Sequence, residues 1–498
     1  MHGKNLKRSL ALLASLFLLL LWSATPLAAK EAKYVFLLIG DGMGIPQRMA
    51  AEQYSGRKMA MDTLPAQGIT TTHAADRFIT GSAASATAMA SGLKTNIGVV
   101  GMDPQLRPVK TLAEMAGDKG MKVGIVSSVS IDHATPAAFY AHVPKRGQYY
   151  DIAVALASSG FEYFGGGGLK DPANKRNNSE DFQGNALELA QKNGYTVISS
   201  KEDFQALDCS VGKVLAYNAW LQNSGALPYD MDTRDQDISL AEFTRKGIEL
   251  LDNDAGFFLM VEAGKIDWAC HANDGKAAIQ DTLAFDRVVQ TALDFYEQHP
   301  EDTLIVVTGD HECGGLTLGF AGTKYATNFE VLGQQNISFR KFTDEILAGF
   351  KEKNEEATFG AMKPLITKYF GLKFDAEPGD PLGLKSHEVV KIMQAFERSL
   401  SGEAEKASDP ETYLLYGGYD PLAVTLTHIL NQKGGMAWTS YKHTGVPVTT
   451  SAVGVASARF NGAYDNTDIA LKIMEAMGLE ARVHYAEQSG DKSLVARQ

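Results

Sequence analysis

The stretch Tyr34-Val35-Phe36-Leu37-Leu38-Ile39-Gly40-Asp41-Gly42-Met43-Gly44 decides the fold class of this chain. Its first six residues are apolar without a break, and they are too few for an ordinary helix. Such a run is typical of a β-strand that is covered on both faces. An acidic residue, Asp41, follows it directly. Ligand sites of α/β folds gather at the carboxyl ends of parallel strands, so we expect Asp41 to face such a site.

Similar short apolar runs recur along the chain, with helical patterns between them. The other expected strands are residues 122–126, 256–261, 303–307 and 450–455. The expected helices are residues 111–117, 240–251, 277–298 and 467–477. This alternation predicts an α/β fold, in which a central, mostly parallel sheet carries helices on both faces.

Residues 323–436 interrupt that pattern, because they contain charged helical segments and no strand of the core type. We interpret them as an inserted, mainly helical cap. The core is then discontinuous and consists of residues 30–322 and 437–481. Residues 482–498 are polar, and we expect them to form a loosely held C-terminal tail.

The first 29 residues have the composition of a secretory signal peptide. Basic residues at positions 4, 7 and 8 precede an apolar stretch, 10–22, and small residues lead to Ala28-Ala29. The apolar stretch is short for a bilayer span, although a retained anchor is the alternative. We therefore expect export to the periplasm or the extracellular space, without stable membrane insertion after cleavage.

Composition excludes some functions. The chain has 498 residues, of which 45% are hydrophobic and 21% charged, as in an ordinary globular protein. Its net charge is −12 and it has no basic patch, so we expect no nucleic-acid partner. An anionic substrate would need local cations such as metal ions. The three cysteines, Cys209, Cys270 and Cys313, form no disulfide framework. We interpret them as packing residues, although a thiol can also bind metal.

Ser82 begins an alanine-rich run after Thr80-Gly81. The run favours a helix, and Gly81 would let the chain turn sharply into it. Ser82 then lies at a helix N-terminus, where free N–H groups and the helix dipole favour an anion. Its hydroxyl is either a helix cap or a nucleophile that attacks an anionic group.

Further carboxylates and imidazoles fall near the ends of the expected strands. Glu262 and the pair Asp310-His311 follow two of them, while Asp267 and His271 have the spacing of neighbours on one helix face. Each pair alone is common by chance, and so is a lone His443. Together they offer the nitrogen and oxygen ligands of zinc. Two zinc ions roughly 4 Å apart would hold both oxygens of an in-line phosphoryl displacement.

Two further groups of residues offer a magnesium site and a phosphate-binding side chain. Thr135, with Asp41 and Glu262, offers the oxygen ligands that magnesium prefers. Arg146 has a planar guanidinium that can hold two phosphate oxygens, although a surface arginine is the plainer interpretation.

The chain resembles the alkaline phosphatases over nearly all of the length after residue 29. The resemblance lies in seven ordered pieces: Ile39 to Gly44, Gly81 to Ala88, His133 to Pro136, Phe164 to Gly167, Val261 to Asp267, Asp310-His311, and His443 to Gly445.

The resemblance implies a role for each matching position. Ser82 would be the nucleophile that forms a phosphoserine, and Arg146 would bind phosphate. Two zinc ions and one magnesium ion would act as cofactors. One zinc would be held by Asp267, His271 and His443, the other by Asp41, Asp310 and His311, and the magnesium by Asp41, Thr135 and Glu262. Many members of the family are homodimers, which implies a homodimer here.

Three positions around the phosphate site depart from the common pattern of the family. Gly81 replaces an aspartate that normally tethers the phosphate-binding arginine, so Arg146 is expected to be less restrained. Trp268 stands where a lysine or histidine is common and supplies no positive charge. His133 stands where some bacterial members have aspartate, which would make the third metal site less selective for magnesium.

The implied function is hydrolysis of small phosphate monoesters to an alcohol and inorganic phosphate. Two alternatives stay open. One is a phosphodiesterase of the same superfamily, although a third cation beside Thr135 and Glu262 favours monoesters. The other is an exported metal- or phosphate-binding protein without turnover, although Ser82 and Arg146 are both present.

Overall fold

A ten-stranded sheet forms the centre of the computed structural model, which describes residues 30–352, 357–402 and 409–486. The expected signal peptide lies outside these residues. From one edge to the other, the strands are β14 (Gly462–Asp465), β2 (Ala66–Thr71), β13 (Val448–Gly454), β8 (Thr303–Gly309), β1 (Tyr34–Gly40), β7 (Phe257–Ala263), β3 (Lys122–Ser127), β4 (Tyr163–Gly166), β6 (Lys213–Tyr217) and β5 (Tyr195–Ile198).

Strand β1 lies in the middle of the sheet, between β7 and β8, and is parallel to both. All seven of its residues are buried, and its side chains enter two separate cores in turn. Phe36 and Leu38 belong to the core on one face, and Val35 and Leu37 to the core on the other. The uninterrupted apolar run of β1 thus reflects a sheet covered on both faces, which confirms the predicted α/β fold.

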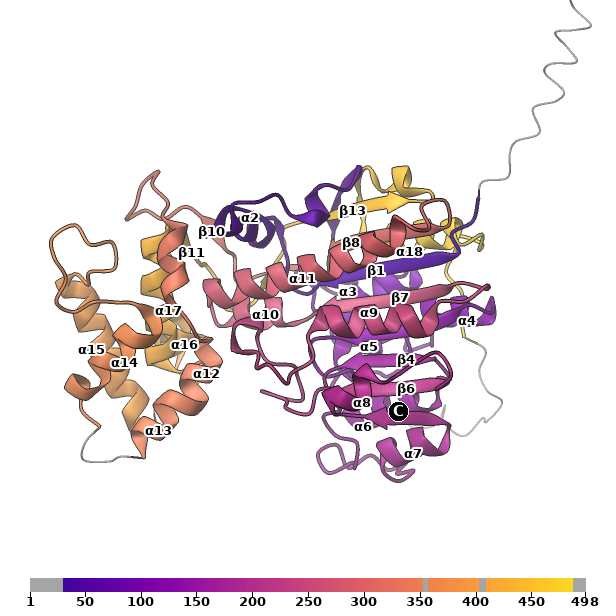
Figure 1. Cartoon of the computed structure of the whole chain (residues 1–498), viewed down its shortest axis with the longest axis horizontal. Helices are drawn as coiled ribbons and strands as arrows, with labels where there is room; N and C mark the ends of the chain where they lie inside the picture. The colour runs from indigo at the N-terminus through magenta and orange to yellow at the C-terminus, as the bar shows by residue number, and fades with distance from the viewer. Residues whose placement is uncertain (1–29, 353–356, 403–408, 487–498) are drawn as a thin grey trace, which may run out of the picture.

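Helices cover each face of the sheet (Figure 1). Helices α9 (Leu240–Leu251) and α11 (Gly275–Tyr296) contribute to the core that contains Phe36, and α3 (Ser82–Ser91) and α18 (Asn466–Ala476) to the core that contains Val35. The other helices around the sheet are α2 (Ile45–Ser55), α4 (Leu112–Asp118), α5 (Ala134–Ala137), α6 (Tyr149–Ser158), α7 (Ala186–Lys192), α8 (Lys201–Gln205) and α10 (Lys265–His271).

The structure differs from the sequence predictions in a few places. Glu262 does not follow its strand but lies within β7, and Asp310 follows β8 directly because Thr308 and Gly309 extend that strand. Strand β13 is antiparallel to β8 and β2. The strands β2, β4, β5, β6 and β14 were not predicted as strands. Three of these five, β4, β5 and β14, have only four residues, too few to show a pattern.

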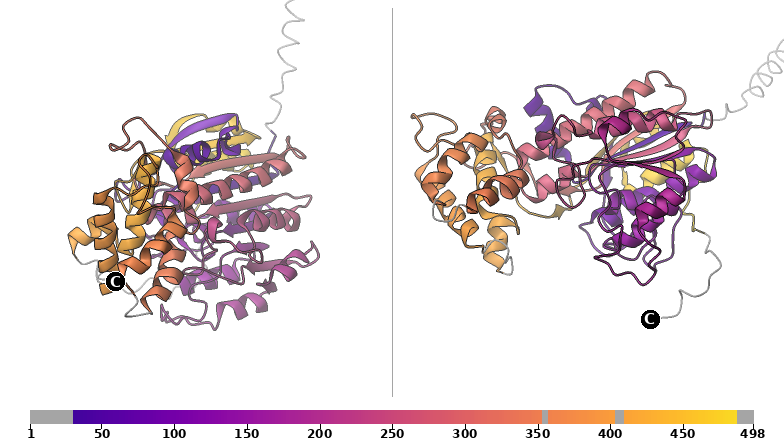
Figure 2. Two further views of the ribbon diagram at one scale, coloured as in Figure 1. Left: turned by 60° about the vertical axis from the view of Figure 1, so that its left-hand side comes forward. Right: turned by 60° about the horizontal axis from the view of Figure 1, so that its bottom comes forward.

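A group of helices lies beyond the carboxyl ends of the parallel strands (Figures 1 and 2). It contains α12 (Phe339–Lys341), α13 (Ala348–Lys351), α14 (Phe359–Phe370), α15 (Ser386–Ser401), α16 (Pro410–Tyr416) and α17 (Pro421–Gly434). At its base, β10 (Thr317–Leu318) pairs with β11 (Met436–Ala437). The segment between these strands is therefore mainly helical, while the exact domain boundaries at 323 and 436 stay a prediction.

Buried hydrogen bonds join this helical segment to the rest of the protein. Asp274, which precedes α11, accepts hydrogen bonds from Gln335 Nε2 at 2.9 Å and from the Phe339 N–H at 2.8 Å. Because Asp274 is fully buried, these bonds hold the start of the segment firmly.

The described part of the C-terminal tail forms two backbone hydrogen bonds with the segment around Pro108. The Lys110 N–H donates to the His484 carbonyl at 2.8 Å, and the Ala486 N–H donates to the Pro108 carbonyl at 3.2 Å. These two bonds attach residues 484 and 486 to the segment around Pro108, while the loose character of the tail stays a prediction. Residues 487–498 lie outside the described part.

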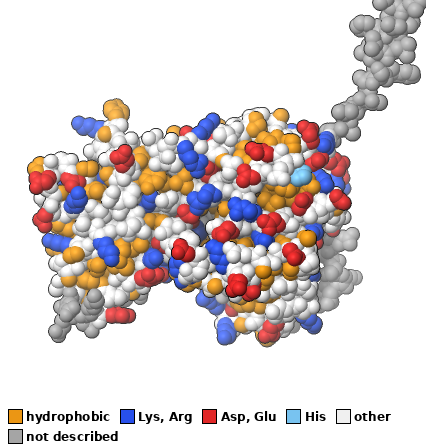
Figure 3. Space-filling model, viewed as in Figure 1, with side chains coloured by type: hydrophobic (Ala, Val, Ile, Leu, Met, Phe, Trp, Pro, Cys, Tyr) orange, Lys and Arg blue, Asp and Glu red, His pale blue; other side chains and the backbone are white. Residues whose placement is uncertain are grey.

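The molecular surface carries mixed charge. On the face drawn in Figure 3, Lys and Arg side chains are interspersed with Asp and Glu side chains. Among the residues that the structure describes, no helix combines the length and the apolar character that crossing a bilayer requires.

Candidate active site

The central strands bring acidic side chains together at their carboxyl ends. In the register of the sheet, Ile39 pairs with Glu262 and Gly40 pairs with Gly309, so Asp41 and Asp310 leave adjacent strands at one level. The turn after β1 needs glycine, because Gly42 has a φ of 74° and a Cβ there would lie 2.7 Å from Asp267 Cα. Its N–H donates to Asp310 Oδ1 at 3.0 Å, which fixes that carboxylate.

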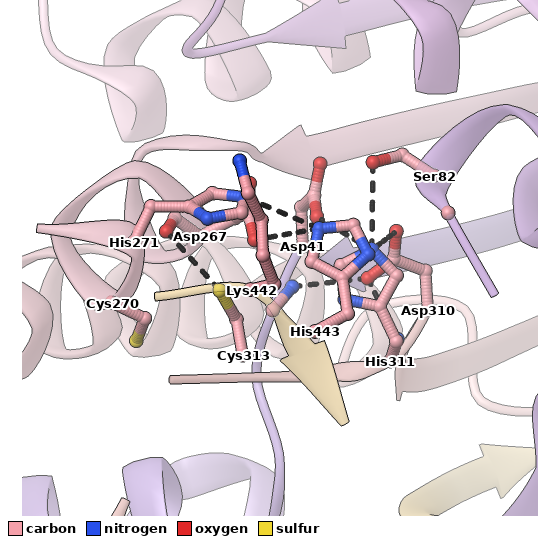
Figure 4. A network of polar contacts seen from close by, with 12 residues as sticks. Asp41, Ser82, Asp267, Cys270, His271, Asp310, His311, Cys313, Lys442 and His443 are labelled. Atoms are coloured by element: carbon pink, nitrogen blue, oxygen red, sulfur yellow. Dashed lines mark hydrogen bonds and ion pairs between the residues drawn. The ribbon is translucent and has the colours of Figure 1, made fainter. Parts of the chain in front are cut away.

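A second group of ligand-type side chains comes from α10 and from a short strand. Asp267 and His271 lie one turn apart on α10, as their spacing predicted, with Asp267 Oδ2 and His271 Nε2 3.3 Å apart. His443 arrives on β12 (His443–Thr444), which pairs antiparallel with β9 (Glu312–Cys313). His443 Nε2 lies 3.5 Å from Asp267 Oδ1 (Figure 4).

The orientation of the two imidazoles in this group indicates a cation. His271 Nδ1 bonds to the Tyr441 carbonyl at 2.6 Å, and His443 Nδ1 to the Thr80 carbonyl at 2.9 Å. A carbonyl only accepts, so each Nδ1 carries the ring proton and each Nε2 presents a lone pair. These two Nε2 atoms face each other at 3.2 Å. A metal ion between them satisfies both lone pairs at once.

Asp41, Asp310 and His311 form another group, and all three are fully buried. His311 Nε2 lies 3.2 Å from Asp310 Oδ2 and 3.5 Å from Asp41 Oδ1. Burial, followed by the charge of Asp310, raises the pKa of Asp41 well above its ordinary value. Burial also raises the pKa of Asp310 to about 8. These carboxylates repel each other and lack solvent, so a bound cation would stabilise their ionised forms.

Asp41 also belongs to a third group with His133 and Glu262. Burial raises the pKa of Glu262 to about 7, although the Ser127 hydroxyl donates a hydrogen bond to it. Within the described residues, several buried polar atoms here have no hydrogen-bond partner: both carboxylate oxygens of Asp41, Glu262 Oε1, Thr135 Oγ1 and His133 Nδ1. Orphaned oxygens that converge in this way fit a cation and its water ligands.

Ser82 is the first residue of α3, and Gly81 is the residue that caps the helix. The alternative of a capping serine is therefore wrong. The Ser82 side chain is buried, and its Oγ lies 3.4 Å from His311 Nε2, on the edge of the second carboxylate group (Figure 4). The hydroxyl thus combines a helix N-terminus with neighbouring metal-type ligands.

Comparison with known proteins identifies this arrangement. A model of the family described as "Alkaline phosphatase" matches residues 32–479. The chain belongs to the alkaline phosphatase family. It is 30% identical over 456 residues to alkaline phosphatase 4 of Bacillus subtilis (strain 168), a match that covers 88% of this chain and 87% of the relative. Streptomycin-6-phosphate phosphatase of Streptomyces griseus is 34% identical over 368 residues, which cover 62% of this chain and 81% of that protein.

Solved structures support the same family assignment. The cold-active alkaline phosphatase from a psychrophilic Shewanella species aligns with 28% identity and a TM-score of 0.72, covering 89% of this chain and 99% of that one. The chain is therefore an alkaline phosphatase, a phosphomonoesterase of a metal-dependent family, and it has residue groups that can hold metal.

Arg146 is held differently from what the sequence suggested for this alkaline phosphatase. The missing carboxylate at Gly81 implied a less restrained arginine. Instead, Arg146 Nη2 donates to His133 Nε2 at 3.1 Å, and that ring is buried. Nor does the chain need glycine at position 81 to turn, because its φ of −127° is open to any residue. The tether is thus an imidazole in place of a carboxylate.

Trp268 lies against this tether. Its ring contacts the His133 ring edge-on, with centroids 5.8 Å apart. Trp268 also lies near the buried Lys265. The Lys265 Nζ is 5.1 Å from the Trp268 ring centroid and 3.7 Å from the Tyr229 ring centroid. Trp268 supplies no cation itself, yet it packs beside the ring that positions Arg146 and so helps to fix that ring.

The sequence interpretation missed residues that shape the site. Cys313 was taken as a packing residue, yet it belongs with Asp267, His271 and His443 to one group of possible metal ligands. Glu312 was not considered. It is buried, it accepts from Gln47 Nε2 at 2.8 Å and from the Thr444 hydroxyl, and so it locks β9 to β12. No spacing signal could have found either residue, because their partners are far away in the sequence.

The carboxylates give a pH-dependent stability that can be measured. We expect the metal-free protein to melt at lower temperature as the pH rises from about 6.5 to 8. Glu262 and Asp310 have raised pKa values, about 7 and about 8, whereas unfolded carboxyls titrate near about 4. Between these values the two carboxyls hold more protons in the folded state than in the unfolded state, so a rise in pH favours unfolding. The pKa values of His133, His311 and His443 are lowered, mainly by burial, and these rings act in the opposite direction only below about pH 6.5, where unfolded histidines are protonated.

Differential scanning calorimetry in excess chelator measures this trend. The matched control is Glu262→Gln, which removes one of the titrating groups and should flatten the slope. A second control is the metal-loaded protein, where cations replace the protons. A melting temperature of the metal-free protein that rises over this pH range would contradict the expectation.

Proposed function

We propose that Ser82 is the nucleophile of this phosphomonoesterase and becomes phosphorylated during each turnover. The observation that carries this proposal is the position of its hydroxyl, buried at the first residue of α3 and 3.4 Å from His311 Nε2. A phosphoryl group on Ser82 would lie at the N-terminus of a ten-residue helix, where free N–H groups and the helix dipole favour negative charge.

Three cation sites are part of the proposal. Asp267, His271 and His443 would hold one zinc ion, and Asp41, Asp310 and His311 another, because carboxylate and imidazole suit zinc. Asp41, Thr135 and Glu262 would hold magnesium. When bound, these ions would lower the pKa of the attacking hydroxyl and neutralise charge on the leaving oxygen. Asp41 belongs to two of the groups and so links their positions.

The protein's own residues would orient the phosphate. Arg146 presents a planar guanidinium to phosphate oxygens, and its bond to His133 Nε2 limits its freedom. Since arginine only donates, His133 Nε2 accepts, and the ring proton sits on Nδ1. A protonated Nδ1 cannot bind a metal ion, but it can donate to a water ligand. This geometry favours a hydrated magnesium at the third site over zinc, the reverse of the lower magnesium selectivity that the residue type alone had suggested.

An acid quench tests the nucleophile. The full chain is mixed with p-nitrophenyl phosphate and denatured at low pH, and the peptide that contains Ser82 is examined by mass spectrometry. The expected result is one added phosphoryl group on Ser82. Turnover with no modified Ser82, or with phosphate on another residue, would overturn the proposal.

The ratio of rates on p-nitrophenyl phosphate and on bis(p-nitrophenyl) phosphate tests the choice between monoesters and diesters. We propose small phosphate monoesters as substrates, because a further cation held by Asp41, Thr135 and Glu262 would stabilise a third non-bridging charge. Faster cleavage of the diester would favour the phosphodiesterase alternative. The homodimer and the periplasmic or extracellular location also remain proposals.

A gain of charge beside the phosphate site should tighten product binding. In Gly81→Asp the backbone is already extended, and the nearest neighbour of the new Cβ is Ile97 Cδ1 at 3.7 Å. A second tether on Arg146 would lower the inhibition constant of phosphate about tenfold, the effect of one charge-assisted hydrogen bond. Trp268→Lys should act in the same direction by adding a cation.

Steady-state inhibition by inorganic phosphate measures these constants. Gly81→Ala is the matched control, since it adds a Cβ without charge and should bind phosphate as the native protein does. Unchanged constants in both Gly81→Asp and Trp268→Lys would show that the His133 tether already orients Arg146 fully.

A further inference from the structure

We propose that the thiolate of Cys313 is the fourth protein ligand of the cation held by Asp267, His271 and His443. The inference deepens the proposed function and rests on its first zinc site. It assigns that site one sulfur, two nitrogens and a carboxylate oxygen, a set that selects a soft or borderline cation such as zinc.

The pairing of β9 with β12 aims Cys313 at the site. The two strands are antiparallel, and Cys313 stands directly opposite His443 in the register. Directly opposite residues project from the same face, with Cβ atoms about 4.5–5.5 Å apart. Since His443 directs its Nε2 at Asp267 and His271, Cys313 lies on the face that carries these ligands (Figure 4).

The distances fit a common ion. One ligand atom each from Asp267, His271, Cys313 and His443 lie within 4.8 Å of one another, and the Cys313 sulfur is the ligand atom of that residue. Zinc binds sulfur at about 2.3 Å and nitrogen at about 2.0 Å, so two ligand atoms of one tetrahedral ion are about 3.5 Å apart. A small inward movement of the side chains therefore closes the group around an ion.

The present partner of the thiol is weak and leaves it free to bind metal. Cys313 is fully buried, and among the described residues its Sγ donates only to the Asp267 carbonyl, at 3.7 Å. On metal binding the thiol proton would pass to solvent, and the sulfur–metal bond would replace this contact. Cys270 offers a contrast, because it is equally buried but its Sγ faces Gln47 Nε2 at 3.7 Å.

The two proposed zinc sites differ in their ligand atoms. Asp41, Asp310 and His311 offer only oxygen and nitrogen, whereas the group with Cys313 adds sulfur. A thiophilic cation such as Cd²⁺ should therefore occupy the sulfur-containing site first. Catalytic zinc can expand from four to five ligands, so four protein ligands do not block a substrate oxygen.

Metal substitution in the full chain tests this assignment without relying on activity. The protein is dialysed against Co²⁺ or Cd²⁺, its metal content is counted, and its near-ultraviolet spectrum is recorded. We expect a sulfur-to-metal charge-transfer band, which disappears in Cys313→Ser and Cys313→Thr. We also expect these variants to bind the first Cd²⁺ equivalent at least about 100-fold more weakly. Replacing a residue that only supports a metal ligand costs up to about 100-fold in affinity, and loss of a ligand itself should cost at least as much.

The matched controls are Cys270→Ser, which removes the neighbouring buried thiol, and Cys209→Ser, which removes the exposed one. Both should keep the band. If Cys313→Ser does not fold, ¹¹³Cd magnetic resonance of the native chain decides, because one sulfur ligand moves the resonance downfield. Full metal content without any sulfur signature would overturn the role of Cys313 alone, whereas a native protein that binds no metal would overturn the proposed function itself.

Discussion

Replacing Ser82 with alanine is expected to lower kcat on p-nitrophenyl phosphate at least about 1,000-fold, in line with the loss of a catalytic nucleophile in other enzymes. The Ser82 hydroxyl is buried beside His311, and no other hydroxyl of α3 shares that position. With alanine there, any remaining hydrolysis would depend on water activated directly at the metal sites. Steady-state kinetics at saturating substrate measure the loss.

Ser91→Ala is the matched control for this change. Ser91 lies on the same helix and is also buried, but its hydroxyl donates to the Thr87 carbonyl at 2.7 Å and not to the site. Ser91→Ala removes one hydroxyl oxygen, as Ser82→Ala does, but it should retain the native kcat. A Ser82→Ala enzyme that turns over as fast as Ser91→Ala would refute the nucleophile.

Replacing Asp41 with asparagine is expected to remove two metal ions at once and to lower kcat/KM at least about 1,000-fold. Asp41 belongs both to the group with Asp310 and His311 and to the group with Glu262. The loss of charge therefore weakens two sites, and the loss of several kcal/mol of charge stabilisation corresponds to this rate factor. Metal counting by mass spectrometry and kinetics measure the two effects.

Asp267→Asn is the comparison that makes the result specific, because Asp267 belongs to only one of the three groups and should cost one metal ion. In chelator, the Asp41→Asn protein should be more stable than the native chain. Burial and, next, the charges of Asp310 and Asp267 raise the pKa of Asp41, which means that its ionised form destabilises the metal-free fold. Measuring this stability therefore shows whether the Asp41 variant loses activity because it unfolds or because it loses metal. Full metal content in Asp41→Asn would contradict the shared role of Asp41.

Local sequence patterns were sufficient for five of the ten strands of the central sheet, among them the four in its middle. The apolar run of β1 and the matching runs of β3, β7, β8 and β13 predicted these strands to within two residues at each end, and α9 was predicted at its observed bounds. Strand β2 was missed for a physical reason. Its sequence, Ala-Gln-Gly-Ile-Thr-Thr, alternates buried and exposed residues but contains too few apolar side chains to show that period.

Residue types and helical spacing also indicated much of the site. The pair Asp267 and His271 followed from a four-residue spacing, and Asp41 from its place after β1. The tether between Arg146 and His133, and the approach of Cys313 to His443, did not. Both depend on how side chains turn after distant segments have packed, and a single sequence carries no signal of that geometry.

The antiparallel pair β10–β11 has a further consequence for the helical segment that it closes. Thr317–Leu318 lies beside Met436–Ala437, so the helical segment between them leaves and returns at one point. The entropy of closing a loop grows only with the logarithm of its length, so this point can accept segments of very different size. His311, directly before β9, and His443, on β12, both lie outside this segment. Exchange of the helical segment at this point is therefore expected to leave His311 and His443 in place.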